Sequence, residues 1–388
     1  MTQTPTARFF TPEQEALRDS ARAFVRKEVL PHLQVWEDAR QVPRELHTKA
    51  AAQGFLGLGV PEEKGGSGGT FLDALALTEA MAEAGASSGL LAALFTSGIA
   101  LPHIVAAGTD SLVDRFVRPT LAGETIGSLA ITEPGGGSDV ANIRTTAVRD
   151  SATGDFVVNG AKTFITSGVR ADFVTTAVRT GEPGWGGISL LVIEKGTPGF
   201  EVTRSLSKMG WHCSDTAELS FTDVRVPAAN LVGEENSGFV LIAQQFVTER
   251  LALAVHGYGI ATRALELTVD YAKQRETFGK PLAARQVVQH KLVEMHRKVD
   301  VARTYTRDVA RRFVNGEEPL AEALQAKAFA VEACEFVVDQ AVQIHGGTGY
   351  MHGIEVERAY RDARILGIGG GATEVLNDLT ARLLGYTA

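Results

Sequence analysis

Residues 156–166 read Phe-Val-Val-Asn-Gly-Ala-Lys-Thr-Phe-Ile-Thr, and this stretch decides the fold class. Its apolar runs at 156–158 and 163–166 flank an Asn-Gly pair, the strongest short signal for a β-hairpin. Further strand-like runs, separated by clusters of Gly, Pro and Asp, follow at 173–178, 188–193 and 217–221. Short apolar runs at this spacing predict an antiparallel β-domain in the middle of the chain.

Helical periodicity lies on both sides of this β-region. Thr11-Pro-Glu-Gln14 has the pattern of a helix start, with Thr11 as N-cap, Pro12 in the first position and Gln14 completing a capping box. After the β-region, four further helical segments are predicted at 237–273, 282–314, 318–343 and 371–384. The sequence therefore predicts an α+β fold with a helical domain at 1–125, a β-domain at 126–236 and a second helical domain at 237–388.

Length and composition limit the classes of function. A chain of 388 residues is long enough for two or three packed domains. The net charge of −8 and the absence of a Lys/Arg-rich run argue against a nucleic-acid partner. Cys213 and Cys334 are too few for a disulfide framework or a Cys-rich metal site, which favours a reducing compartment.

The sequence shows no segment typical of membrane insertion or export. The first ten residues lack the apolar core of a secretory signal and the Arg-rich character of a transit segment. No stretch reaches the roughly 18 apolar residues needed to span a bilayer. We expect a cytoplasmic protein that makes no membrane contact.

Glu249 is the most informative single residue for chemistry. On a helix it shares the apolar stripe of Ile242, Phe246 and Leu253. Burial without a cationic partner raises the pKa of a carboxyl group above its free value near 4.3, which suits proton abstraction at neutral pH. A structural acid paired with an arginine is the alternative, and periodicity alone favours it; Arg250 is not that partner, because adjacent helical residues do not face each other.

Other chemical motifs carry less weight. Gly367-Ile-Gly-Gly-Gly-Ala372 matches the spacing of a dinucleotide fingerprint, but too little chain follows for a βαβ unit. What remains is flexible backbone at a helix N-terminus, where a ligand could approach closely, or a plain Gly-rich turn. The histidines lack metal-ligand spacing, so no metal site is predicted, and neither Ser138 nor Ser167 lies in the elbow that a serine hydrolase needs.

Five motifs, taken in order, resemble the acyl-CoA dehydrogenase family over nearly the whole chain. They are Ile131-Thr-Glu-Pro-Gly-Gly-Gly-Ser-Asp139, Lys162-Thr-Phe-Ile-Thr-Ser167, Arg275-Glu-Thr-Phe-Gly-Lys280 with Gln286, Gln343-Ile-His-Gly-Gly347, and Tyr360-Arg-Asp362. The resemblance implies an FAD-dependent enzyme that desaturates an acyl-CoA to the trans-2-enoyl-CoA. It also implies a C-terminal four-helix bundle, a homotetramer and an electron-transferring flavoprotein as electron acceptor.

The resemblance also implies cofactor positions. Those expected to line the flavin ring are Leu129, Ile131, Thr132, Phe164 and Thr166, and Ser138 matches a contact to both flavin phosphate and CoA. Strands give a rigid platform on which Phe164 offers an aromatic face, although core packing would equally explain that phenylalanine. Positions expected to contact the FAD of a partner subunit are Arg275, Phe278, Gln286, Gln343 and Gly347. Arginine is well suited to phosphate.

The catalytic base has two positions in the family. Many members carry it in the C-terminal Gly-rich loop, where this chain has Gly370. The isovaleryl-CoA and long-chain members carry it on the helix with a Glu-Arg-Leu sequence, which Glu249-Arg250-Leu251 matches. Glu249 is therefore the expected base, and the N–H of Gly370 is expected to meet the thioester oxygen. Glu374 is the competing carboxylate, at a position that matches a cofactor contact.

The expected substrate is a branched short or medium acyl group. Gly369 replaces the bulky residue found beside the base in straight-chain members, Phe95 matches the floor of the acyl pocket, and Arg250 is also assigned to the substrate site. Val247, where Asp is common, and Ala372, where Thr is common, depart from the family pattern. The alternative substrate is a long-chain acyl group. The alternative enzyme is an oxidase that passes the electrons to oxygen. A non-catalytic scaffold that kept the fold is the alternative from a different class of function.

Overall fold

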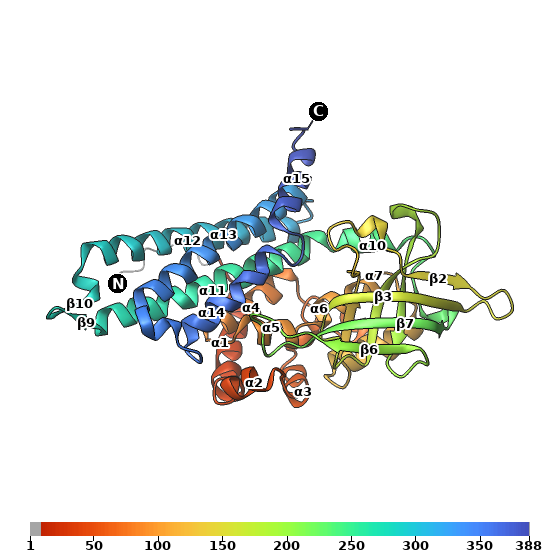
Figure 1. Cartoon of the computed structure of the whole chain (residues 1–388), viewed down its shortest axis with the longest axis horizontal. Coiled ribbons are helices and arrows are strands. Elements are labelled where there is room, and N and C mark those ends of the chain that lie inside the picture. Colours follow the sequence, from red (N-terminus) through yellow and green to blue (C-terminus); the bar gives the residue numbers. More distant parts are fainter. Residues whose placement is uncertain (1–8, 388) are drawn as a thin grey trace. The chain divides into compact units, whose positions relative to one another are not determined.

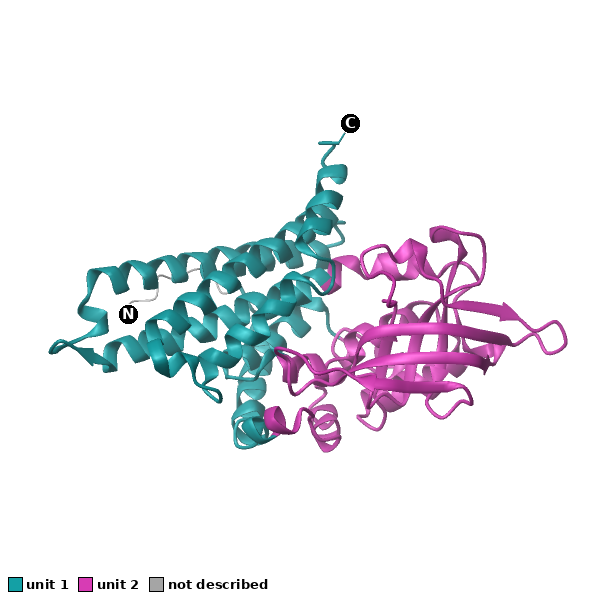
Figure 2. Ribbon diagram, in the orientation of Figure 1, with its two compact units in different colours: residues 1–35, 69–88, 250–388 teal, residues 36–68, 89–249 magenta. Residues whose placement is uncertain are grey.

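The computed structural model describes residues 9–387. The chain divides into two compact units (Figure 2). Unit 1 comprises residues 1–35, 69–88 and 250–388, and unit 2 comprises residues 36–68 and 89–249. The predicted order of a helical region, a β-region and a second helical region is confirmed.

The α-helices are α1 (Pro12–Phe24), α2 (Leu33–Ala39), α3 (Glu45–Ala52), α4 (Phe71–Glu83), α5 (Ser88–Leu94), α6 (Ser97–Ala100), α7 (Pro102–Ala107), α8 (Asp110–Leu112), α9 (Arg118–Leu121), α10 (Gly238–Gln244), α11 (Phe246–Gln274), α12 (Gln286–Val314), α13 (Leu320–His345), α14 (Glu355–Ala363) and α15 (Thr373–Leu383). The strands are β1 (Gly127–Ala130), β2 (Thr146–Arg149), β3 (Phe156–Thr166), β4 (Phe173–Arg179), β5 (Ile188–Glu194), β6 (Phe200–Ser205), β7 (Thr216–Val226), β8 (Leu231–Val232), β9 (Glu276–Thr277) and β10 (Lys280–Pro281).

Unit 2 is built on a mixed sheet in the order β6-β7-β3-β2-β4-β5-β8, with β1 also paired to β4. The strands β6, β7, β3 and β2 are labelled in Figure 1. Most neighbours are antiparallel, as predicted, but β1 and β2 both pair with β4 in parallel. Alternate residues of β3, among them Phe156 and Val158, point into an apolar core that includes Val174, Leu191 and Phe221. The sheet thereby becomes a rigid support for the residues at its surface.

The hairpin predicted at Asn159–Gly160 is wrong. Both residues lie inside β3, which continues to Thr166, and the register with β7 shifts between Val158 and Gly160. Gly160 has φ +148°, and an added Cβ there would lie 2.6 Å from Thr145 Oγ1. The glycine therefore serves a β-bulge and a close approach of backbone, which are the other reasons for glycine within a strand.

Unit 1 is helical, and its first helix begins as predicted. Gln14 N–H donates to Thr11 Oγ1 at 3.3 Å, and Thr11 N–H donates to Gln14 Oε1 at 3.2 Å. The predicted helix 237–273 is broken at Gln245 into α10 and α11, and α14 was not predicted. α14 is only nine residues long and most of them are charged, so it is easily taken for part of a loop, although its few apolar residues recur at helical spacing.

A buried ion network joins four helices of unit 1. Glu79 of α4, which is fully buried, accepts hydrogen bonds from Arg18 Nη1 of α1 at 2.8 Å and from Tyr258 Oη of α11 at 2.8 Å. Arg307 Nε of α12 donates to the same carboxylate at 3.1 Å. Elsewhere in this unit α13 packs along α12 and contacts both α14 and α15 (Figure 1).

No single helix within residues 9–387 has both the length and the apolar composition to cross a bilayer. Two bent pairs, Ser88–Leu94 with Ser97–Ala107 and Gly238–Gln244 with Phe246–Gln274, reach those limits only when the two members are taken together.

Candidate functional site

Unit 2 brings the five predicted ring-lining residues onto neighbouring segments. Thr163 N–H of β3 donates to Thr132 O at 2.9 Å, and Ser128 Oγ of β1 donates to Thr166 O at 2.5 Å. These bonds hold the end of β1 and the residues after it against β3. Leu129, Ile131, Thr132 and Thr166 are half-buried and Phe164 is exposed, so the five form an accessible platform.

Phe164 has two features that core packing does not explain. Its side chain is 68% exposed, and its backbone has φ +59° in the left-handed region. The β3–β7 register shifts between Lys162 and Ile165, so the bulge re-aims this side chain. An exposed aromatic residue held in a costly conformation is typical of a binding surface, and its open face fits a planar ring such as isoalloxazine.

A buried ion pair supports this platform from below. Lys162, which is 1% exposed, donates from Nζ to Ile131 O at 2.9 Å and to Glu133 Oε1 at 2.9 Å. Glu133 also accepts the N–H groups of Arg144 and Thr145 at 2.6 and 2.8 Å. Burial lowers the pKa of Lys162 to about 8 although Glu133 opposes it, and burial would raise the pKa of Glu133, which Lys162 holds below its usual value. The pair fixes the segment that carries Ile131 and Thr132.

Two further predicted residues of unit 2 lie outside the platform. Ser138 is exposed in the Gly-rich turn that follows Thr132. Phe95 follows α5 and is half-buried, and its N–H donates to Leu91 O at 2.9 Å. Ser138 is therefore accessible to a polar ligand.

The Gly-rich loop 369–371 of unit 1 packs against the first turns of α11. Gly370 is exposed and has φ +61°, and an added Cβ there would lie 2.1 Å from Leu253 Cδ1. An added Cβ at Gly371 would lie 3.6 Å from Arg250 Nη2. Arg250 and Leu253 of α11 therefore lie beside the backbone of Gly370 and Gly371. Glu374 follows in the first turn of α15, where it is exposed.

Lys327 of α13 holds this loop from the protein interior. The side chain is fully buried, and Nζ donates to Gly369 O at 2.9 Å and to Gly371 O at 2.6 Å. Burial lowers the pKa of this ammonium to about 8, and the positive charge of Arg250 lowers it further in the same direction.

Glu249 lies in the first turn of α11, one turn before Leu253. It is half-buried rather than fully enclosed. The break at Gln245 places Ile242 on α10, so the stripe predicted from Ile242 to Leu253 is not a single helical face. Phe246 and Leu253 remain on the same helix as Glu249, at the spacing predicted.

The residues predicted to reach a partner subunit's cofactor lie on two adjacent exposed segments of unit 1. Arg275, Phe278 and Gln286 belong to the β9–β10 hairpin and the start of α12, and Gln343 and Gly347 belong to the end of α13. Tyr271 joins the segments, because its ring stacks on His345 with centroids 4.2 Å apart. Phe278 lies in the hairpin turn with φ +50° and is 96% exposed.

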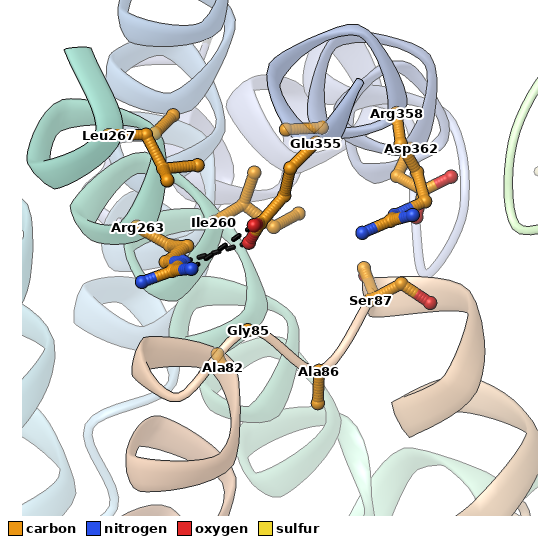
Figure 3. A pocket seen from close by; sticks show the side chains of 13 residues that line it. Ala82, Gly85, Ala86, Ser87, Ile260, Arg263, Leu267, Glu355, Arg358 and Asp362 are labelled. Carbon is orange, nitrogen blue, oxygen red and sulfur yellow. Dashed lines mark hydrogen bonds and ion pairs between the residues drawn. The ribbon is translucent and has the colours of Figure 1, made fainter. Parts of the chain in front are cut away.

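Unit 1 also contains a small pocket between the end of α4, α11 and α14 (Figure 3). Arg263 of α11 forms an ion pair with Glu355 of α14 at 2.7 Å at its wall, and Ser87, Arg358 and Asp362 also line it. None of the predicted site residues lines this pocket.

Three supporting residues were not predicted as site residues: Glu133, Lys162 and Lys327. Lys162 and Glu133 were quoted within motifs, but a lysine in a strand gives no sign of its partner. Lys327 had a readable signal, because it lies between Leu324 and Val331 on an apolar helix face. A lone lysine on such a face requires buried acceptors.

Comparisons with known proteins agree with one another. Family models for the acyl-CoA dehydrogenase N-terminal, middle and C-terminal domains match residues 11–124, 128–224 and 236–385. The mitochondrial long-chain specific acyl-CoA dehydrogenase of Rattus norvegicus is 38% identical over 98% of this chain and 89% of that protein. The mitochondrial isobutyryl-CoA dehydrogenase of Bos taurus is 34% identical over 96% of this chain and 89% of that protein. A crystal structure of a candidate acyl-CoA dehydrogenase from Mycobacterium smegmatis is 59% identical, with a TM-score of 0.96 over 98% of this chain and 100% of that one.

Proposed function

Because the chain belongs to the acyl-CoA dehydrogenase family, we propose that it desaturates an acyl-CoA to the trans-2-enoyl-CoA with Glu249 as the base. Members of this family are FAD-dependent oxidoreductases that act on the CH–CH bond of acyl-CoA thioesters. The proposal concerns which residues act and on which substrate.

The observation that supports Glu249 is the position of Leu253. Leu253 Cδ1 occupies the space into which a side chain at residue 370 would project, 2.1 Å from an added Cβ. The loop position for the base therefore has neither a side chain nor free space in this protein. A carboxylate one helical turn before Leu253, on the same helix, is the alternative that the sequence provides.

The roles of the protein groups follow from the chemistry of a thioester. Glu249 removes the α-proton as a general base, which requires its carboxylate to be ionised near neutral pH. The charge that develops on the thioester oxygen needs a donor, and the exposed N–H of Gly370 supplies one. Bound FAD would supply the acceptor for the hydride that leaves the β-carbon.

The cofactor residues are proposed in two groups. The platform of Leu129, Ile131, Thr132, Phe164 and Thr166 would hold the flavin ring, with Ser138 at the phosphate and CoA side. Arg275, Phe278, Gln286, Gln343 and Gly347 would contact the FAD of a neighbouring subunit, and Glu374 would contact cofactor. The exposed Phe278 supports an assembly, because its ring is 96% exposed in a turn of positive φ although Arg285 lies over it, 5.7 Å from the ring centroid.

The proposal also includes a homotetramer, an electron-transferring flavoprotein as the electron acceptor, and a cytoplasmic location. We also propose the domain bounds 1–125, 126–236 and 237–388, which the three family matches support. A non-catalytic scaffold is the weaker alternative, because the exposed ring of Phe164 in a left-handed conformation would have no use without a bound ring.

The proposed substrate is a branched short or medium acyl group. An added Cβ at Gly369 would meet nothing closer than Ile365 O at 3.5 Å, so the glycine leaves open space rather than serving a tight contact. The similarity to an isobutyryl-CoA dehydrogenase supports a branch, and the similarity to a long-chain enzyme supports the rival.

The decisive experiment compares Glu249→Gln with Glu374→Gln. Purified protein is mixed anaerobically with a panel of straight and branched acyl-CoAs, and flavin absorbance near 450 nm is followed as the yellow colour of oxidised flavin bleaches. We expect Glu249→Gln to retain bound FAD and to lose at least about 10³-fold in the rate of bleaching, whereas Glu374→Gln keeps that chemistry. Rapid bleaching by Glu249→Gln would transfer the base to another residue.

A further inference from the structure

Lys327 is a buried cation whose contacts converge on the Gly-rich loop. Its side chain is fully buried, and Nζ donates two hydrogen bonds to carbonyl oxygens of that loop, Gly369 O at 2.9 Å and Gly371 O at 2.6 Å. An ammonium removed from water is costly unless its donors are used, so this arrangement requires an explanation. Packing alone would be served better by an apolar residue.

The first of these contacts acts on the N–H of Gly370. The carbonyl of Gly369 and the N–H of Gly370 belong to one peptide group, which is planar and trans, as are all peptide bonds within residues 9–387. The carbonyl and the N–H of such a group point in opposite directions. Fixing the oxygen of Gly369 on Lys327 Nζ therefore fixes the direction in which the N–H of Gly370 points.

The same contact also changes the strength of that donor. A hydrogen bond from an ammonium draws electron density toward the carbonyl oxygen, and polarisation along a chain of hydrogen bonds makes the N–H at the other end of the peptide a better donor. Among the hydrogen bonds of residues 9–387 none uses the N–H of Gly370, which lies on an exposed residue. The polarised donor is thus available to a ligand.

The loop has little else to hold its conformation. Gly370 and Gly371 have φ +61° and +88°, and neither has a side chain. Glycine backbone has more conformational freedom than that of any other residue. The N–H of Gly369 is tied to Ile365 O at 2.8 Å, but the orientation of the next peptide group depends on Lys327.

We propose that Lys327 is a positioning residue for the reaction, which aims and polarises the N–H of Gly370 toward the oxygen of the thioester. The proposal rests on the proposed function, because it assigns that N–H to the charge that develops when the α-proton leaves. Lys327 does not touch the substrate; it acts through the peptide group between Gly369 and Gly370.

The test uses the FAD-containing full-length protein with Lys327→Met, Lys327→Arg and Lys327→Gln. Lys327→Met removes the charge and both hydrogen bonds at similar length, whereas Lys327→Arg keeps a cation. Arg307→Met is the control for loss of stability, because it removes a half-buried cation of the same unit that contacts the buried Glu79 and not the loop.

The first readout is the carbonyl stretch of a bound enoyl-CoA labelled with ¹³C at C1, chosen to match the best acyl-CoA of the panel. In the wild-type protein and in Arg307→Met the band should shift to lower frequency on binding. In Lys327→Met we expect a band closer to that of the free thioester, and Lys327→Arg should recover part of the shift. A wild-type band in Lys327→Met with FAD retained would overturn the proposal.

Kinetics and hydrogen exchange supply two further readouts. Removing a direct oxyanion donor costs about 10²–10³-fold in kcat. The neutral Lys327 variants keep the N–H of Gly370 and lose only its alignment, so kcat should fall roughly 10–100-fold while KM changes only a few-fold. Amide exchange of a peptide spanning 369–372 should become faster in Lys327→Met and Lys327→Gln and stay unchanged in Arg307→Met. Unchanged kcat and unchanged exchange in either neutral variant would contradict the role.

The pH dependence of kcat tests whether the charge of Lys327 is needed, or only the size of its side chain. Burial, followed by the nearby charge of Arg250, brings the pKa of Lys327 to about 8. Below that pH the ammonium is present, so kcat should fall as pH rises through about 8 in the wild type. Lys327→Arg, which stays protonated, should lack this decline; the same decline in Lys327→Arg would count against the proposal. A wild-type protein that binds no flavin or is reduced by no acyl-CoA would instead refute the proposed function.

Discussion

Leu253 Cδ1 stands where a side chain on Gly370 would have to begin, 2.1 Å from an added Cβ. The loop and the helix are therefore matched to each other: the glycine has lost the side chain, and the leucine fills the space. A base on the loop and Leu253 in its present rotamer exclude each other sterically. Leu253 and Gly370 thus form one coupled feature rather than two independent residues.

Relocating the base to the loop should therefore need three changes. In a Glu249→Gln background, Gly370→Glu alone should leave activity near that of Glu249→Gln, because Leu253 and the positive φ of residue 370 oppose the new side chain. Adding Leu253→Ala should raise the rate of flavin bleaching by at least about 10-fold over the double variant. Leu253→Ala alone is the control for the cavity that this substitution creates. Equal rates with and without Leu253→Ala in the Glu249→Gln, Gly370→Glu protein would disprove the coupling of Leu253 and Gly370.

The sequence predicted the order of the regions because periodicity and capping are local. The capping box of Thr11 and Gln14 formed as expected, since both groups lie within one helical turn. Asn159–Gly160 was misread because a bulge and a hairpin use the same residues, and only the approach of Thr145 distinguishes them. The roles of Lys162 and Lys327 depend on acceptors 29 to 44 positions away in the chain, and such pairings are set by tertiary packing.

Phe164 should matter for binding and not for folding. Its side chain is 68% exposed and its φ is +59°, so Phe164→Gly should stabilise the apoprotein by up to about 1 kcal/mol, and Phe164→Ala should change it by less than about 0.5 kcal/mol. Both variants should weaken FAD binding by at least about 10-fold through loss of the aromatic face. Urea unfolding of apoprotein and fluorescence titration with FAD measure the two effects. A large loss of apoprotein stability in Phe164→Ala would show instead that the ring belongs to the core.

Lys162→Met should damage both folding and the cofactor platform. Removing one partner of a buried ion pair leaves Glu133 uncompensated, which costs about 3–5 kcal/mol of unfolding free energy. The segment at Ile131 also loses its anchor, so FAD content should fall. Lys162→Met with Glu133→Gln should recover part of the stability, and Lys195→Met, at an exposed lysine of the same unit, is the matched control. If Lys162→Met is as stable as the wild type, the ion pair makes no net contribution to the free energy of unfolding.

Acid should destabilise the protein before most carboxylates titrate. Burial lowers the pKa of His47, His103 and His256 to about 4 each. Unfolded histidine has a pKa near 6.5, so the unfolded chain binds about three more protons than the native one between that pH and about 4. The free energy of unfolding should therefore fall as pH falls through this window, by up to about 4 kcal/mol per pH unit. Urea unfolding at pH 7, 6 and 5 measures the slope. His103→Leu should reduce the slope by about a third, and His290→Gln, at an exposed site, should leave it unchanged; a slope that His103→Leu leaves unchanged would show that His103 is already protonated in the native state.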